Sequence, residues 1–153
     1  AMSSQAMESA DRSLPLPDII CFALYSANHA MQRVYAPLLA DLGLTYPQYL
    51  VLVRLWQEDD QTVGALGRAL NLDSNTLTPL LKRIEAQGLV QRTRSATDER
   101  QVRITLTPAG RALQDRARDI PDCIFERSGL DGAGLTALRD AITALRDQLR
   151  QDG

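Results

Sequence analysis

The chain has 153 residues, a formal net charge of −2, and a composition that is 44% hydrophobic and 24% charged. This length suits one domain with a buried core, and the composition excludes a fibrous or wholly disordered protein. The sequence shows neither an apolar run near the roughly 18 residues of a membrane span nor a secretion signal, so we expect a cytoplasmic protein with no membrane partner. Residues 1–13 are expected to form a disordered tail.

Positive charge is concentrated in the middle of the chain. The formal net charge is −4 over residues 1–81, +4 over residues 82–111 and −2 over residues 112–153. Nucleic-acid binding requires such local concentration and not a basic chain overall. The two cysteines, Cys21 and Cys123, are too few for a disulfide scaffold, and with His29 they are too few for a structural zinc site. The sequence therefore predicts no metal and no cofactor.

Apolar spacing predicts five or six helices and one β-hairpin. The first helix should run from about residue 18 to 41. Thr45 should cap a second helix that ends at Gln57 and turns Leu50, Val53 and Trp56 inward. Two further helices, over residues 63–70 and about 74–87, are joined by a turn so tight that a helix-turn-helix is predicted. The buried stripe of the second of these should comprise Leu77, Leu80, Leu81 and Ile84.

After Gly88 the period of the pattern changes. Residues 89–94 and 102–106 alternate apolar with polar side chains, which predicts two strands of a hairpin with a protruding charged tip. Thr107 and Pro108 should begin another helix, interrupted near Pro121. The last helix carries leucine and isoleucine at alternating spacings of three and four, which is typical of a helix that packs on another helix. With the first helix, it should form a large apolar dimer interface. The acidic segment 58–60 is predicted to be a solvated turn.

This order of elements resembles the MarR family of dimeric bacterial regulators over roughly residues 15–150, and residues 97–110 (TDERQVRITLTPAG) are close to its most recognisable signature. The resemblance implies a mainly α fold with a small β-hairpin, in one domain over residues 14–153. Its winged helix-turn-helix, at about residues 45–107, would be flanked by dimerisation helices at about 18–42 and 108–151. Such a homodimer would bind double-stranded DNA at a palindromic operator.

Small polar and basic side chains on the outer face of the reading helix suit base edges and phosphates in a major groove. In the predicted wing, Arg100 is our choice for insertion into a narrow minor groove. Asp98 is expected to orient Arg100 or a backbone group more than to touch DNA, because a carboxylate is repelled by phosphate. The predicted DNA-binding residues are Ser74, Asn75, Thr76, Thr78, Lys82, Arg83, Arg94, Asp98 and Arg100.

Cys21 stands near the start of the first helix, where the helix dipole favours a thiolate, and Tyr25 lies one turn further on. The segments CFALYSA (21–27) and LTYPQY (44–49), with Tyr35, resemble the organic-hydroperoxide-sensing (OhrR-type) branch of the family. That resemblance implies that the Cys21 thiolate is the peroxide target. It also implies support from Tyr25 and from Tyr35 and Tyr46 of the partner subunit, and an intersubunit disulfide with Cys123 after oxidation.

We therefore predict a repressor, not an enzyme, that leaves its operator when organic hydroperoxide oxidises Cys21. One alternative is a MarR-type regulator controlled by a small phenolic ligand in the cleft beneath the dimer helices, with Cys21 incidental. A thiol peroxidase is a weaker alternative, because the chain lacks a Cys-x-x-Cys pair and a thioredoxin-like pattern. A DNA-compacting protein would bind without sequence preference.

Overall fold

The computed structural model describes residues 15–97 and 101–151, which form helices and one small antiparallel sheet. The predicted tail over residues 1–13 and two predicted wing residues, Asp98 and Arg100, lie outside the described residues. In chain order the elements are η1 (Leu16–Asp18), α2 (Ile20–Ala40), α3 (Tyr46–Gln57), β1 (Gln61–Thr62), α4 (Val63–Leu70), α5 (Ser74–Ala86), β2 (Val90–Arg94), β3 (Val102–Leu106), α6 (Pro108–Arg116), α7 (Ile120–Ser128) and α8 (Gly132–Arg150).

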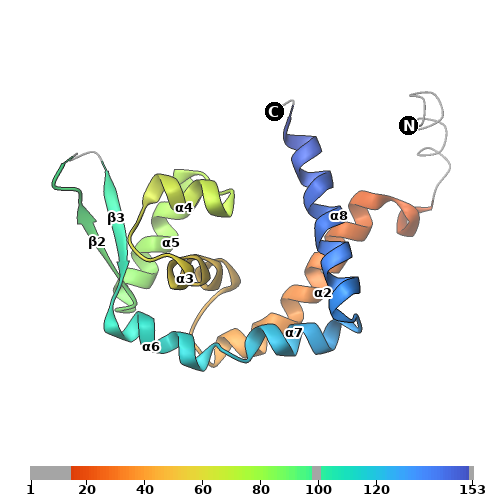
Figure 1. Cartoon of the computed structure of the whole chain (residues 1–153), viewed down its shortest axis with the longest axis horizontal. Helices are drawn as coiled ribbons and strands as arrows, with labels where there is room; N and C mark the ends of the chain where they lie inside the picture. Colours follow the sequence, from red (N-terminus) through yellow and green to blue (C-terminus); the bar gives the residue numbers. More distant parts are fainter. Residues whose placement is uncertain (1–14, 98–100, 152–153) are drawn as a thin grey trace.

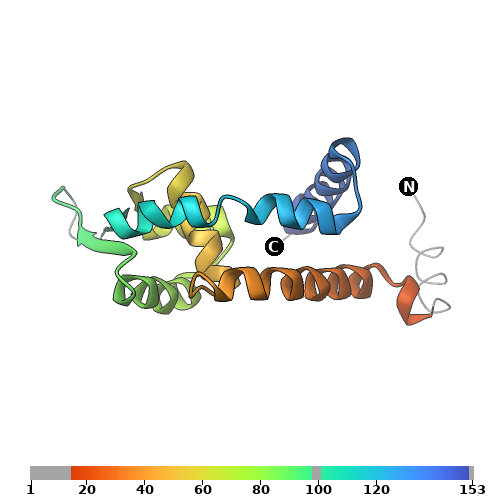
Figure 2. The same ribbon diagram turned by 90° about the horizontal axis from the view of Figure 1, so that it is seen from below.

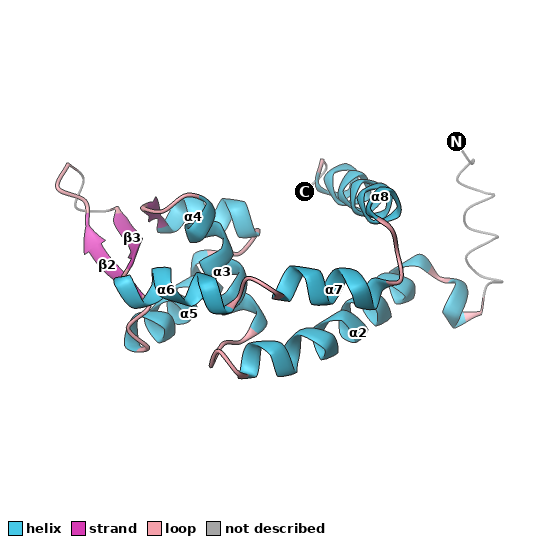
Figure 3. Ribbon diagram, turned by 60° about the horizontal axis from the view of Figure 1, so that its bottom comes forward, coloured by secondary structure: helices cyan, strands magenta, loops and turns pink. Residues whose placement is uncertain are grey.

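One end of the molecule is a winged helix. The sheet has the order β1-β3-β2, and both strand pairs are antiparallel, with Arg92 opposite Ile104 in the hairpin. Figure 1 shows this hairpin extending from the lobe built by α3, α4 and α5, and Figure 3 shows its base beside α6. The predicted mainly α fold with a winged helix-turn-helix is therefore confirmed. The two-residue strand β1 was missed, because a strand so short has no detectable alternation.

The hydrophobic core lies almost wholly in this lobe. Its fully buried side chains come from α3, α4, α5 and β3, where the predicted stripe of α5 is confirmed. The long helix α2 contributes a single buried residue, Leu39, close to its C-terminal end, and α7 contributes Ile120 at its start. Helix α8, described along its whole length, has no buried residue. The half of the molecule away from the wing therefore lacks a core of its own.

Helix α2 and the pair α6–α7 form two long rows that connect the two halves (Figure 2). Helix α7 packs along α2, and α8 stands at the end of the molecule opposite the wing in all three overall views. The break between α6 and α7 falls at residues 117–119, with Pro121 in the first turn of α7, as predicted. No helix within residues 15–97 and 101–151 is both long and apolar enough to cross a membrane.

The predicted inward face of α3 is confirmed in part, because Leu50, Val53 and Trp56 pack against the core. Leu50, Val53 and Trp56 are only half-buried, whereas the fully buried apolar residues of α3 are Tyr49, Val51, Leu52 and Leu55. The reason is that α3 packs against α2, α4, α5 and α6 at once, so its apolar surface covers more than one side. Leu50, Val53 and Trp56, spaced three residues apart, lie at one edge of that apolar surface.

Side-chain caps fix where the helices of the lobe begin. Thr45 caps α3 in a reciprocal pair with Gln48, in which each side chain accepts a hydrogen bond from the other residue's backbone N–H. Thr62 caps α4 and Asp73 caps α5 through the same kind of bond to the backbone three residues on. Thr107 caps α6, as the sequence predicted.

Gly110 allows α6 to pack against the base of the wing. A methyl group on its Cα would lie 3.1 Å from the backbone carbonyl carbon of Leu89 and would overlap that group's oxygen. The Leu89 carbonyl cannot move aside easily, because it accepts a hydrogen bond from the backbone N–H of Thr107 at 3.1 Å. Only glycine fits this close approach of two backbones.

We expect Gly110→Ala to lower the free energy of unfolding by at least about 1–3 kcal/mol, the usual cost of overpacking a site that cannot relax. Gly132→Ala is the matched control, since a Cβ there meets nothing within 4 Å in the first turn of α8. Urea denaturation of both variants provides the measurement. Equal stabilities for the two variants would contradict this role of Gly110.

Candidate functional site

Two local features fix the turn between α4 and α5. Asn71 ends α4 in the left-handed conformation, with φ of 57°, which asparagine tolerates better than most residues. Gly67 leaves room for the Leu72 backbone, because a Cβ on Gly67 would lie only 2.8 Å from the Leu72 carbonyl oxygen. The turn thus holds the first turn of α5 at a fixed angle to α4.

The predicted reading residues lie along α5, and most of them point to solvent. Ser74, Asn75 and Thr76 occupy its first turn and are exposed, while Lys82 and Arg83 are exposed two turns further on. Thr78 is half-buried and so is less accessible than the sequence suggested. The outer face of α5 therefore offers hydroxyl and amide groups at one end and two cations at the other.

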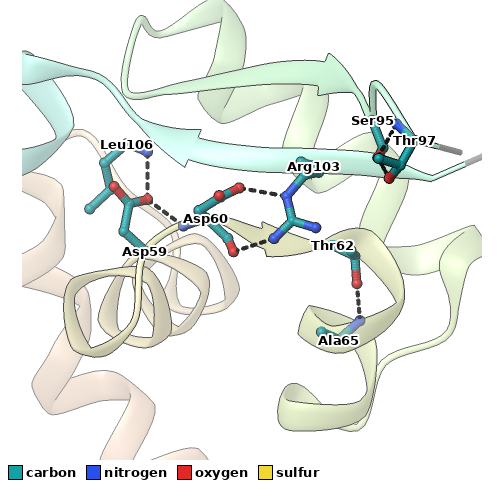
Figure 4. A network of polar contacts seen from close by, with 8 residues as sticks. All are labelled: Asp59, Asp60, Thr62, Ala65, Ser95, Thr97, Arg103 and Leu106. Atoms are coloured by element: carbon teal, nitrogen blue, oxygen red, sulfur yellow. Dashed lines mark hydrogen bonds and ion pairs between the residues drawn. The ribbon is translucent and has the colours of Figure 1, made fainter. Parts of the chain in front are cut away.

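Two aspartates of the α3–β1 connection hold the wing (Figure 4). Asp59 accepts hydrogen bonds from the backbone N–H of Leu106, at 2.9 Å, and from the Arg111 guanidinium. Asp60 forms an ion pair with Arg103 of β3 at 2.7 Å, and its backbone carbonyl also accepts from Arg103 at 3.0 Å. This segment was predicted to be a solvated turn. Instead, half-buried Asp59 ties α3 to the base of the wing.

The wing strands carry further basic residues. Arg94, at the end of β2, is exposed. The β2 strand is also joined to the reading helix, because the backbone N–H of Arg92 donates to the Glu85 carboxylate at 3.1 Å. The wing and α5 are therefore joined directly.

Cys21 is the second residue of α2, exposed and free, while Cys123 is a half-buried free thiol in α7. Tyr25, one turn after Cys21, is 62% exposed, and its ring is tilted against that of His29 with centroids 4.9 Å apart. The three residues Cys21, Tyr25 and His29 thus follow one face of α2 at four-residue intervals. From the sequence, His29 was considered only as a possible zinc ligand, and its contact with Tyr25 was missed.

Tyr35 and Tyr46 meet where α2 packs on α3. Their ring centroids lie 4.9 Å apart, and Tyr49 adds a third ring 5.9 Å from Tyr35. Burial, and then the neighbouring Tyr46 and Tyr49, raise the pKa of Tyr35 to about 12. Burial also raises the pKa of Tyr46, and burial followed by Tyr46 raises that of Tyr49. At neutral pH the cluster therefore consists of uncharged phenols, which can donate hydrogen bonds.

The structure does not bring Tyr35 and Tyr46 to Cys21 within one chain. Tyr35 follows Cys21 by fourteen residues in the same helix, and a rise of 1.5 Å per residue separates their backbones by about 21 Å. Tyr46 is next to Tyr35 and is equally remote. The thiol and these two phenols can therefore form one site only between two chains.

Cys123 is also remote from the Cys21 of its own chain. A cleft of about 300 Å³ is lined by Ala30, Met31 and Val34 of α2 and by α7 residues including Ile124. The α7 residue next to Cys123 thus shares a cleft with a stretch of α2 that begins nine residues after Cys21, or about 13 Å along the helix axis. A disulfide requires Cα atoms within about 7 Å. An intrachain bond would need a large movement of the backbone.

Comparison with known proteins identifies the family. The family model described as transcriptional regulator SarA/Rot matches residues 33–117, more than half of the chain. The chain belongs to this MarR-like winged-helix family of transcriptional regulators. Members of this family are not enzymes. The chain is 45% identical over 145 residues to the organic hydroperoxide resistance transcriptional regulator of Bacillus subtilis, covering 95% of this chain and 99% of that protein.

Two solved structures of AbfR, a protein of Staphylococcus epidermidis, resemble the chain in different degrees. Reduced AbfR bound to DNA has a TM-score of 0.77 at 35% identity, with 97% of both chains covered. Disulfide-formed AbfR has a TM-score of 0.60 at 36% identity and the same coverage. The conformation described here is thus closer to that of reduced AbfR.

The raised pKa of Tyr35 makes a prediction about stability at high pH. Its pKa is higher in the folded than in the unfolded protein, so its contribution is fully present below about pH 10 and is lost as the pH rises through about 12. Tyr35→Phe lacks this titration. We expect the free energy of unfolding of the wild type, relative to Tyr35→Phe, to fall between pH 10 and 12 in urea titrations. A constant difference would contradict the burial of this phenol.

Proposed function

We propose that this regulator is a homodimeric, DNA-binding repressor that leaves a palindromic operator when organic hydroperoxide oxidises Cys21. The phenols of Tyr35 and Tyr46 from the partner chain, with the local Tyr25, stabilise the reacting thiolate. Oxidation continues to a disulfide between Cys21 of one chain and Cys123 of the other. The reading heads, which include Ser74 to Arg83 of α5 and the wing, are thereby displaced from their half-sites.

The exposed apolar side chains in the half of the molecule without a core support a dimer. Leu138, Ile142 and Leu149 of α8 are 51%, 42% and 70% exposed, and Ile20 and Met31 of α2 are also exposed. A helix with one apolar stripe and no buried residue is not stable in water on its own. A second copy that presents the same faces would cover both helices, and such interfaces typically bury more than about 2,000 Å².

The observation that carries the redox proposal is the separation of Cys21 from Tyr35 and Tyr46. A lone exposed thiol in the first turn of a helix would be an ordinary surface cysteine. The uncharged phenols at the other end of α2 are half-buried hydrogen-bond donors that suit a thiolate without adding a charge. An antiparallel pairing of two α2 helices would bring each thiol to the phenols of the other chain.

The chemistry needs no metal and consumes one peroxide per site. The thiolate sulfur attacks the terminal oxygen of the hydroperoxide, the O–O bond breaks, and the products are a sulfenic acid and an alcohol. The Cys123 thiol of the other chain then attacks the sulfenic sulfur, so that an S–S bond forms and water leaves. We expect the two thiols, which belong to different chains, to begin farther apart than a disulfide allows, so that closing this bond drags α2 and α7 from their positions.

The relatives support both parts of the proposal. The Bacillus subtilis protein is named for organic hydroperoxide resistance, and AbfR has been solved both reduced on DNA and with its disulfide formed. This chain matches the disulfide form of AbfR less well than the reduced form, so the two redox states of AbfR differ in conformation. The alternative of a phenolic effector is not favoured by these comparisons.

The test is operator binding by the reduced protein, repeated after one equivalent of cumene hydroperoxide. We expect release of the wild type and no release of Cys21→Ser, with random competitor DNA present to exclude binding without sequence preference. Non-reducing electrophoresis should show a covalent dimer for the wild type alone. Cys123→Ser should be oxidised at Cys21 and yield no covalent dimer. Release of Cys21→Ser by hydroperoxide would overturn the proposal.

A further inference from the structure

A continuous series of aromatic rings runs from α2 along α3. Tyr35 of α2 contacts Tyr46 and Tyr49 in the first turn of α3, with ring centroids 4.9 and 5.9 Å apart. Tyr49 in turn meets Trp56 edge to face, with centroids 6.3 Å apart. These rings connect the phenols of the proposed thiol site to the third turn of α3 without a gap.

Trp56 connects this series to the base of the wing. Its indole Nε1–H donates to the backbone carbonyl of Gly110 at 2.9 Å, across 54 positions of the chain. Gly110 lies in the first turn of α6 and packs against the backbone of Leu89, next to the start of β2. Thr107 closes the same junction, since its hydroxyl donates to the Gly88 carbonyl at 2.6 Å.

We propose that Trp56 is the positioning residue through which the thiol site controls the reading head. This inference rests on the proposed redox function and names the route within each chain. When the phenols of Tyr35 and Tyr46 follow the oxidised sulfur, the rings of Tyr49 and Trp56 move with them. The Trp56 indole then displaces the first turn of α6 and, with it, the wing.

Two physical features make Trp56 suited to this role. Close-packed rings do not deform gradually, so a shift at one end of the series changes the packing at the other end. The indole also makes one directed hydrogen bond to a backbone atom, which fixes α6 more narrowly than apolar contact would. A route of this kind is established only by a measured coupling between the two sites.

The test measures the ratio of operator dissociation constants for oxidised and reduced protein in Trp56→Phe. Phenylalanine keeps a ring and removes only the indole N–H and its bond to Gly110. We expect the ratio to fall by about fivefold relative to wild type, the factor of one ordinary hydrogen bond. The rate of Cys21 oxidation should not change, because Trp56 meets Tyr49 and is not one of the phenols that serve the thiol.

Tyr49→Phe is the matched control, because it keeps the ring contacts of the series and should keep the wild-type ratio. If Trp56→Phe loses thermal stability but retains the wild-type ratio, Trp56 is only a packing residue and the inference is overturned. A wild type that hydroperoxide does not release would instead contradict the proposed function itself.

The chain has a single tryptophan, which allows a second measurement on the unmodified protein. Indole emission should shift when the wild type is oxidised, at the same rate as operator release, and should stay constant in Cys21→Ser. Tyr49→Leu breaks the series one contact earlier while keeping the Trp56 hydrogen bond. It should be oxidised without the emission shift, and an unchanged shift in this variant would overturn the inference.

Discussion

The length of α2 imposes the constraint on which the proposed chemistry of this regulator depends. Its 21 residues separate the thiol at one end from the phenols of Tyr35 and Tyr46 at the other by about 21 Å of helix. The N-terminal half of the same helix lies outside the core, and so does the whole of α8. In one chain, therefore, the thiol of Cys21 lacks the phenols, and the apolar faces of α2 and α8 in the same half of the molecule lack a covering partner. A second copy would complete both together, so sensing and dimer formation would share one interface.

Helix α3 connects this interface to the DNA-reading lobe. Its first turn holds Tyr46 and Tyr49 against α2, and its third turn holds Trp56 against α6. The connection that follows it carries Asp59, which binds the backbone at the end of β3. One short helix therefore contacts both the phenols and the base of the wing. A winged helix packed this closely would turn as a unit, which is the movement that release from two half-sites requires.

The sequence predicted those features that depend on neighbours along the chain. Period, caps and turns located the helices, the hairpin and the break near Pro121, because each is set within a few residues. The Thr45–Gln48 pair was also readable, since threonine followed three residues later by glutamine is a capping signal. The inward face of α3 was identified only in part, because neighbours on several sides cover this helix. The ion pairs of Asp59 and Asp60 and the bond from Trp56 to Gly110 join residues 43 to 54 positions apart, and no local pattern reports them.

The central claim is that each Cys21 is served by phenols of the other chain, and mixed dimers test it most directly. One chain would carry Cys21→Ser with its tyrosines intact, and the other would keep Cys21 but carry Tyr35→Phe and Tyr46→Phe. In the mixed dimer the remaining thiol faces the intact phenols of its partner. We predict that hydroperoxide oxidises this thiol at the wild-type rate, faster than in the homodimer of the double tyrosine variant. A rate equal to that of the double-variant homodimer would contradict the claim.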